Sequence, residues 1–484
     1  MSGLFALVLM IPATLAADDL ATEVRRFLEV YAAVERNAAD PVPPEQAFYQ
    51  GAIPGMLRKL DPHSVFFDPG QFEQLKKLQT SMEKGFGTVV SVLPGRVIVL
   101  QTLAGTPSAK AGISPGDEIL AVNGYQLSML DMEQIVGLLG QSRQQQARLV
   151  IKRPGNARML DVVLTPEELQ SPSVSRSFFV GPAIAYVKVT SFDENTGRQI
   201  AEKIEAMGGS KLKALVLDLR DNPGGVLDAA IQTCALFLKP GSVIVTVRGR
   251  AAPERVIKVS ETARPYEFPV AVLVNERSAS ASEVVSGALQ DHDRATIVGE
   301  GSFGKGLVES VYPLSESTGL ALTTALYYTP SGRSIQKPLD AARFELAGKT
   351  SAAHREYRTA AGRVVKGGGG ITPDRTVRPA PYTRLRAVLD ASGSVTSFAT
   401  EYLASHKISA DFEVTPSLLD DFKVYLAQRA IQPPVGEWST DREWIRNRLK
   451  AEIFNQALGV EKGDEVEAER DPAILAALEI LSRD

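Results

Sequence analysis

Short apolar runs alternate with helical stretches between residues 173 and 329, and this alternation constrains the fold more than any other feature of the chain. Helices are expected after Asn195, from Val226 and from Ser282. Strands are expected at residues 184–189, 215–219, 270–274, 296–298, 307–314 and 320–328. Strands that alternate with helices pack as a sheet covered by those helices. We therefore predict an α/β domain over residues 168–381.

Residues 85–167 follow a different pattern, rich in short strands. Four strands are expected, at residues 88–93, 96–102, 118–122 and 147–152, with one helix at 132–139 and an exit linker at 165–168. Three segments together resemble a PDZ domain: Gly-Phe-Gly-Thr at 85–88, Ser-Ala-Lys-Ala-Gly-Ile at 108–113, and Pro-Gly-Asp-Glu-Ile-Leu-Ala-Val-Asn-Gly at 115–124.

The PDZ resemblance implies a peptide-binding site at Gly85, Phe86, Gly87 and Thr88. Glycines leave backbone N–H groups free to converge on a terminal carboxylate, and an adjacent strand edge can accept an added strand. Taken alone, the two glycines would indicate only a turn into a strand. With the other two segments, they predict docking of a C-terminal tail.

Both ends of the chain are expected to be helical, over residues 17–84 and 382–484. Ahead of the first helical region, residues 1–16 combine an apolar run with small residues before Asp18, which is typical of a cleaved signal peptide. The first three residues contain no Lys or Arg, so a retained anchor is the alternative. We predict export to the periplasm or another part of the bacterial envelope, with membrane association only if the segment is uncleaved.

Composition excludes several classes of function. The formal net charge is -4 and no Lys/Arg cluster stands out, so no nucleic-acid partner is expected. The single cysteine, Cys234, lies in an apolar run and is interpreted as a buried thiol. The four histidines (His63, His292, His354 and His406) lack ligand spacing, so we expect no metal site and interpret them as surface or structural residues.

An apolar strand at 270–274 runs into Ser-Ala-Ser-Ala-Ser-Glu at 278–283 and then into a helix. Ser280 would thus sit at a helix N-terminus, where unpaired N–H groups and the helix dipole suit an oxyanion. The same residues, Ser280 to Glu283, also form a capping box, which would need no chemistry. A nucleophilic serine requires a base, and a lysine can serve if burial lowers its pKa.

That lysine is found in the sequence Phe-Gly-Lys-Gly at 303–306, which places Lys305 25 residues after Ser280. Both segments and their separation resemble the carboxy-terminal processing (tail-specific) protease family. The resemblance extends over residues 60–375, beginning at Leu-Asp-Pro-His-Ser, residues 60–64. It implies Ser280 as nucleophile and Lys305 as general base, in place of a mere helix cap.

A diglycine turn follows the expected strand at 215–219, in the sequence Asn-Pro-Gly-Gly at 222–225. Glycines allow backbone N–H groups to approach a substrate carbonyl without a Cβ in the way. The resemblance implies that an amide of Gly224 or Gly225 forms the oxyanion hole together with that of Ala281. The alternative is a plain turn between a strand and a helix.

Glu309 departs from the family, which usually has glutamine at this position to orient the base. Residues four apart on a strand share a face, so the Glu309 carboxylate should reach Lys305. An ionised carboxylate would favour the charged ammonium and oppose its work as a base. We therefore hypothesise activity shifted to higher pH, or a resting form held by this ion pair.

Two rival functions remain open from the residues. The glycine-rich sequence at 299–306 also satisfies a nucleotide-binding pattern, but it leads into a strand where that motif requires a helix. The second rival is an inactive PDZ scaffold, for which Glu309 is the sequence argument. Retention of both Ser280 and Lys305 argues against it.

The resemblance implies an α/β multidomain serine endopeptidase, with a PDZ domain inserted ahead of a crotonase-like protease core. Its substrates would be proteins or peptides with accessible C-termini, cleaved near or from that end without a cofactor. It also implies homo-oligomers or adaptor proteins that bind the terminal helical regions.

Overall fold

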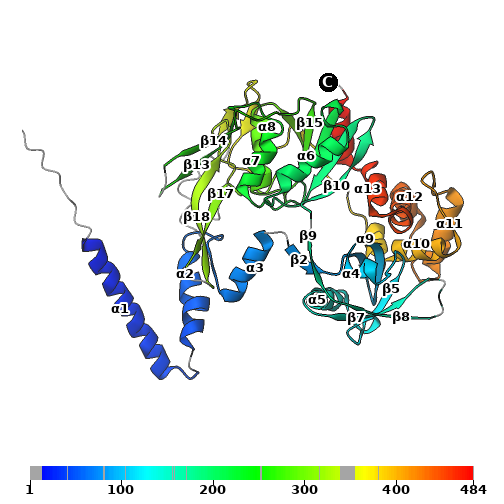
Figure 1. The fold of residues 1–484 in the computed structure, drawn as a ribbon, viewed down its shortest axis with the longest axis horizontal. Helices are drawn as coiled ribbons and strands as arrows, with labels where there is room; N and C mark the ends of the chain where they lie inside the picture. The colour runs from blue at the N-terminus through cyan, green and yellow to red at the C-terminus, as the bar shows by residue number, and fades with distance from the viewer. Residues whose placement is uncertain are drawn as a thin grey trace, which may run out of the picture.

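The computed structural model describes residues 14–482, apart from residues 41, 80–81, 104, 155, 157, 171, 251–252, 315–316, 338–354 and 380. N-terminal helices, a β-rich domain, a larger α/β domain and C-terminal helices follow one another along the chain (Figure 1). The predicted signal peptide, residues 1–16, falls almost entirely outside the described residues. Among the helices of the described part, none has both the length and the apolar character of a membrane span.

A six-stranded sheet forms the centre of the α/β domain. In spatial order its strands are β10 (Val174–Gly181), β11 (Ile184–Val189), β12 (Ala214–Asp218), β15 (Val270–Val274), β16 (Ala295–Gly299) and β21 (Arg375–Thr376). All neighbouring pairs are parallel except β10 with β11. Every residue of β12 and β15 is buried, as expected of a parallel sheet covered on both faces.

Helices cover the two faces of this sheet unequally. One face packs against α6 (Thr196–Ala206), α7 (Leu227–Ala235) and α8 (Ala281–Asp291), and a 3-10 turn, η3 (Gly209–Lys211), follows α6. The other face packs against α14 (Pro472–Leu481). This last helix therefore completes the core of the α/β domain, although the sequence pattern places it in the C-terminal helical region.

A second sheet of five strands has β18 (Gly319–Tyr328) at its centre. Its other members are β1 (Val65–Phe67), β17 (Leu307–Pro313), β13 (Val243–Gly249) and β14 (Arg255–Lys258). The sequence pattern predicted β17 and β18 but missed β1, β13 and β14, which are short or lack a regular burial pattern. A separate hairpin pairs β19 (Glu356–Arg358) with β20 (Val364–Lys366).

The β-rich domain is a separate antiparallel sheet with its own core. Its strands are β3 (Thr88–Leu93), β4 (Arg96–Thr102), β5 (Glu118–Val122), β6 (Tyr125–Gln126), β7 (Ala147–Lys152) and β8 (Leu160–Leu164). Helices α4 (Pro107–Lys110) and α5 (Met132–Ser142) and the turn η2 (Leu127–Met129) complete it. The residues predicted as an exit linker instead include β9 (Glu167–Gln170), which pairs with β2 (Met82–Gly85).

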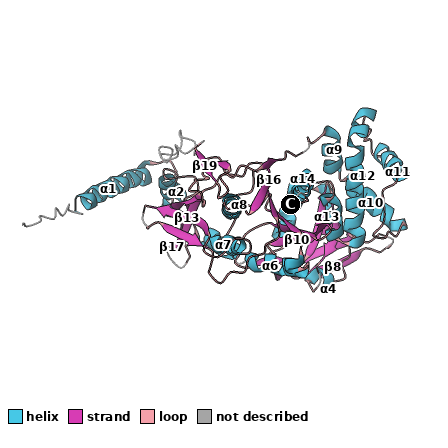
Figure 2. Cartoon of the chain, turned by 90° about the horizontal axis from the view of Figure 1, so that it is seen from above, coloured by secondary structure: helices cyan, strands magenta, loops and turns pink. Residues whose placement is uncertain are grey.

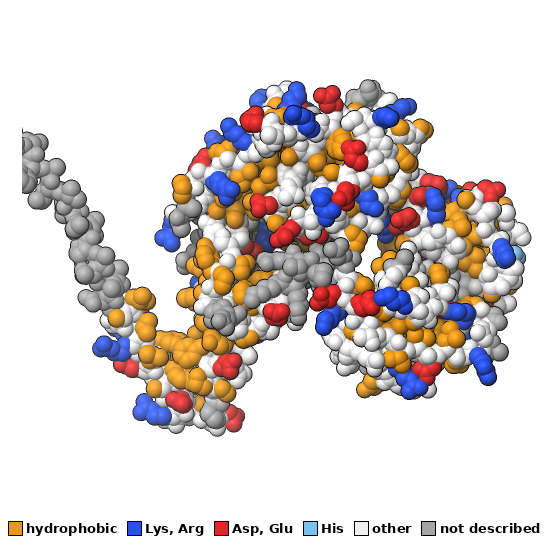
Figure 3. Space-filling model, viewed as in Figure 1, with side chains coloured by type: hydrophobic (Ala, Val, Ile, Leu, Met, Phe, Trp, Pro, Cys, Tyr) orange, Lys and Arg blue, Asp and Glu red, His pale blue; other side chains and the backbone are white. Residues whose placement is uncertain are grey.

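Helices form both ends of the chain. At the N-terminal end are α1 (Thr14–Asn37), a π-helical turn η1 (Gln46–Ala52), α2 (Ile53–Leu57) and α3 (Pro69–Gln79). At the other end are α9 (Arg384–Ser392), α10 (Ser394–Ser405), α11 (Pro416–Ala427), α12 (Val435–Leu458) and α13 (Val460–Ala468). Helix α1 projects away from the body in Figures 1 and 2, and hydrophobic side chains gather near its base in Figure 3.

Candidate active site

Ser280 lies in a tight turn between β15 and α8. Its backbone has φ 53° and ψ -113°, a conformation that costs a residue with a side chain about 1–3 kcal/mol. The turn is held from both sides, because the Ser278 hydroxyl donates to the Leu219 carbonyl (2.7 Å) and the Phe303 N–H donates to the Ser278 carbonyl (2.9 Å). A strained residue held in this way, at the start of a helix, is a candidate for function rather than for stability.

The diglycine turn packs directly against Ser280. A Cβ on Gly224 would lie 2.7 Å from the Ala279 carbonyl oxygen and 2.8 Å from the Ser280 Cβ, and one on Gly225 would lie 2.0 Å from the Phe192 carbonyl oxygen. The two glycines also have φ values of 101° and 144°. Only glycine can therefore occupy either position without displacing the turn.

The two glycine amides are not equivalent. The Gly224 N–H donates to the Asn222 Oδ1 at 2.9 Å, so it is not available to a substrate in this conformation. The N–H groups of Gly225 and Ala281 donate no hydrogen bond to any described residue. The sequence pattern left Gly224 and Gly225 as alternatives, and of the two amides only that of Gly225 is free of a hydrogen bond to a described residue.

Glu283 links the segment that carries Ser280 to the segment that carries Lys305. The Oε2 of this buried carboxylate accepts from the backbone N–H groups of Ser280 and Lys305, each at 2.9 Å. Its Oε1 accepts from the Ser302 hydroxyl (2.5 Å) and the Gly304 N–H (2.7 Å). Burial raises the pKa of Glu283, while the hydrogen bonds to its oxygens act in the opposite direction.

The sequence pattern identified Glu283 only as part of a capping box, and that motif is present at the start of α8. Its three contacts to residues 302–305 could not be read from local spacing, because those residues lie about twenty positions further along the chain. One carboxylate therefore sets the distance between the two segments of the site.

Lys305 and Glu309 form an ion pair. The Lys305 Nζ lies 2.9 Å from the Glu309 Oε1, and both side chains are about three-quarters buried. The predicted contact between the Glu309 carboxylate and Lys305 is therefore present in the structure. Among the hydrogen bonds of the described residues, none joins the Lys305 Nζ to the Ser280 hydroxyl.

His63 lies beside this ion pair, although the sequence pattern indicated a surface or structural histidine. Its Nδ1 is 3.9 Å from the Glu309 Oε1. Burial and the positive charge of Lys305 lower the pKa of His63, against the opposing influence of Glu309 and Asp61. The sequence signal that could have placed His63 at the site is Leu-Asp-Pro-His-Ser at 60–64, which resembles a segment of the family.

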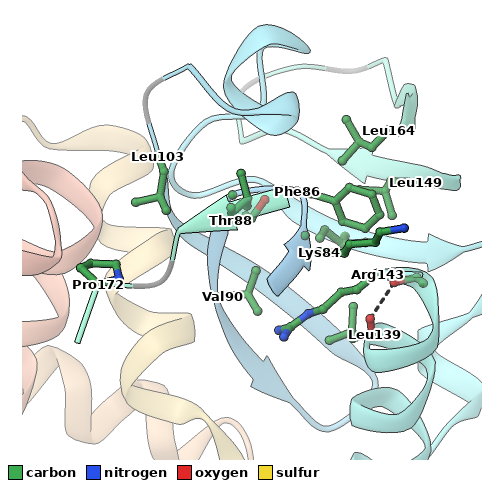
Figure 4. Close-up of a pocket in the computed structure, with 15 residues that line it drawn as sticks. Lys84, Phe86, Thr88, Val90, Leu103, Leu139, Arg143, Leu149, Leu164 and Pro172 are labelled. Atoms are coloured by element: carbon green, nitrogen blue, oxygen red, sulfur yellow. Dashed lines mark hydrogen bonds between the residues drawn. The ribbon is translucent and has the colours of Figure 1, made fainter. Parts of the chain in front are cut away.

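The four residues predicted to bind a peptide border a groove between β3 and α5 (Figure 4). The N–H groups of Phe86 and Gly87 donate no hydrogen bond to any described residue. The Thr88 hydroxyl contacts that of Ser108 at 2.5 Å. The remaining lining is mostly apolar, with two cations and one serine: Val90, Leu103, Ile119, Leu139, Leu149, Leu164, Leu169, Pro172, Lys84, Arg143 and Ser142.

Glu283→Gln should weaken both the fold and the activity. The amide nitrogen would face N–H donors that now point at a carboxylate oxygen, which should cost about 1–3 kcal/mol of unfolding free energy. A displaced Lys305 or Ser280 should lower the cleavage rate about 10²-fold. Urea unfolding and peptide cleavage measure the two effects. Glu276→Gln, an exposed carboxylate in the same loop, is the control, and wild-type behaviour of Glu283→Gln would contradict the linking role.

Comparisons with known proteins agree with this geometry. The Peptidase family S41 profile matches residues 183–340, and a PDZ domain profile matches residues 98–153. A carboxy-terminal-processing protease of Bartonella bacilliformis is 37% identical over 321 residues, covering 65% of this chain and 73% of the relative. One from Synechocystis is 32% identical over 292 residues, covering 59% and 68%. The chain belongs to the carboxy-terminal-processing proteases, serine peptidases of family S41.

Proposed function

We propose that this peptidase is an endopeptidase that cleaves proteins near or from their C-termini, with Ser280 as nucleophile and Lys305 as general base. The observation that carries the proposal is the shared contact with Glu283, whose Oε2 accepts from the N–H groups of both residues. It ties the two segments together across 25 positions of sequence. The parallel sheet covered by helices is consistent with the crotonase-like core that the resemblance implies.

The proposed reaction proceeds through an acyl-enzyme. The Ser280 hydroxyl attacks the scissile carbonyl while a neutral Lys305 amine takes its proton. The N–H groups of Gly225 and Ala281 stabilise the oxyanion. The Lys305 ammonium then protonates the leaving amine, and the C–N bond breaks. A water molecule gives its proton to Lys305 and attacks the ester. The proton passes from Lys305 to the Ser280 oxygen as the ester bond breaks, which restores both groups.

The ion pair between Glu309 and Lys305 opposes this cycle. An ionised carboxylate 2.9 Å from the Lys305 Nζ favours the ammonium form, which cannot accept a proton. We propose that this ion pair is a resting form, and that the active form has lost the extra proton from Lys305. Glutamine at the same position would orient the amine without favouring its charged form.

Four proteins should be compared on one unfolded substrate across pH: wild type, Ser280→Ala, Lys305→Ala and Glu309→Gln. The first two variants should lose about 10⁴-fold or more in rate, since either removes a member of a unit that acts together. Glu309→Gln should stay active and reach its full rate at lower pH than wild type, because the ammonium form is no longer favoured. A fluorophosphonate probe should label wild type and not Ser280→Ala.

Undiminished cleavage by Ser280→Ala would overturn the mechanism, and an unchanged pH profile of Glu309→Gln would overturn the resting ion pair. Failure of wild type both to react with the probe and to cleave would favour the inactive PDZ scaffold.

We propose that the PDZ groove binds the C-terminal tail of the substrate. The free N–H groups of Phe86 and Gly87 suit a terminal carboxylate, Arg143 adds a positive charge at the groove, and the apolar lining suits an apolar last side chain. The strand β9 also contributes Leu169 to the groove. A bound tail would therefore touch the connection between the PDZ domain and the protease core.

Leu139→Asp should weaken binding of a fluorescent peptide with an apolar C-terminus about tenfold or more, because it places a charge in the groove. Fluorescence anisotropy measures the change. Val136→Asp, on the same helix but 54% exposed and outside the groove, is the matched control. Equal affinity of the two variants would contradict tail docking at this site.

We also propose export of the protein, supported by the apolar run and the small residues within positions 1–16. N-terminal sequencing of the mature protein should find a start near Ala17. An intact Met1 on protein recovered from the envelope would instead indicate a retained anchor.

A further inference from the structure

The turn that carries His63 is fixed by hydrogen bonds to its own residues. The Asp61 carboxylate accepts from the N–H groups of His63 (2.7 Å) and Ser64 (2.8 Å) and from the Ser64 hydroxyl (2.8 Å). The Ser64 Oγ in turn accepts from the Thr323 N–H at 3.2 Å. Since the next residue, Val65, pairs with Ala321 of β18, the turn is held against the sheet that carries Glu309.

One oxygen of Glu309 faces both basic side chains. The Oε1 lies 2.9 Å from the Lys305 Nζ and 3.9 Å from the His63 Nδ1. Tyr327 of β18 also faces this carboxylate, and burial followed by the charge of Glu309 raises its pKa to about 12, so it stays neutral. The charged groups that face His63 are therefore Lys305, Glu309 and, within its own turn, Asp61.

We propose that His63 is a positioning residue that acts through Glu309, holding the proton that Lys305 must lose to become a base. In the resting form the proton is on the Lys305 Nζ, and His63 is neutral. In the active form an N–H bond of Lys305 has broken and one at the His63 Nδ1 has formed, with the Glu309 carboxylate between them. No proton is gained or lost, and Glu309 remains paired in both forms. The proposal rests on the assignment of Lys305 as base.

The electrostatics of the three groups support this exchange. Burial and the ammonium of Lys305 lower the pKa of His63, and the carboxylate of Glu309 raises it. When the proton leaves Lys305, the repulsion disappears while burial and the attraction to Glu309 remain, so His63 becomes a better acceptor than it is beside the ammonium. Coupling between two titrating sites is reciprocal, so a protonated His63 also disfavours the charged form of Lys305.

The exchange explains how a carboxylate can replace the usual glutamine without abolishing the base. Glutamine has no charge that needs a partner after the lysine becomes neutral. The charge of Glu309 does need a partner, because an unpaired carboxylate in a partly buried site is unfavourable. His63 supplies that partner.

The activity test is a double-mutant cycle of His63 and Glu309, in which the cleavage rate of each variant is measured across pH. His63→Gln should move the low-pH limb of the cleavage profile up by roughly one pH unit and lower the rate at pH 7 about tenfold. In the Glu309→Gln background, the same His63→Gln change should leave the profile where it is. His406→Gln, which alters an exposed histidine of the C-terminal helices, is the control. Equal shifts from His63→Gln in both backgrounds would overturn the proposal.

A second test reads the coupling without catalysis. The chain has only four histidines, so NMR titration of the His63 ring is practicable in the full-length Ser280→Ala protein. Adding Lys305→Met should raise the pKa of His63, and adding Glu309→Gln should lower it. A His63 that responds to neither change would overturn the proposal. If the ring responds as expected but Lys305→Ala cleaves as wild type does, the assignment of the base is wrong while the coupling stands.

Discussion

The buried carboxylate of Glu283 is the interaction on which the rest of the site depends. It lies in the first turn of α8 and accepts hydrogen bonds from both segments of the site, which the bond from the Phe303 N–H to the Ser278 carbonyl also joins. Taking a carboxylate out of water is expensive unless its oxygens are satisfied. Because these four donors include the amides of Ser280 and Lys305, the requirement to satisfy Glu283 also fixes the positions of the proposed nucleophile and base.

The central sheet makes this arrangement possible. Its central strands, β12 and β15, are buried throughout, and their carboxyl ends lie along one edge, where β12 leads to the diglycine turn and β15 leads to Ser280. The close approach of Gly224 to Ser280 depends on that alignment. Surrounding structure of this kind can hold a strained residue such as Ser280, which would relax without it.

The second sheet brings a different set of charges to the same place. Lys305 lies just before β17, Glu309 lies on it, and β1 aligns the turn of His63 beside them. The N-terminal region is thus part of the protease site rather than an appendage to it. Lys305 and His63 both lie near one oxygen of Glu309 there, at 2.9 and 3.9 Å.

The sequence by itself determined the family and predicted many of the strands and helices. Hydrophobic periodicity predicted β11, β15 and the four long strands of the PDZ domain, because burial of alternate or continuous residues leaves a local signature. The spacing of Ser280 and Lys305 within two motifs led to the prediction of the pair. Only the tertiary structure decided which glycine amide is free, since Gly224 is engaged by the side chain of Asn222. It also showed the contacts of Glu283, His63 and α14, whose partners lie far away in the chain. Contacts between distant segments follow from packing, and no local sequence pattern encodes them.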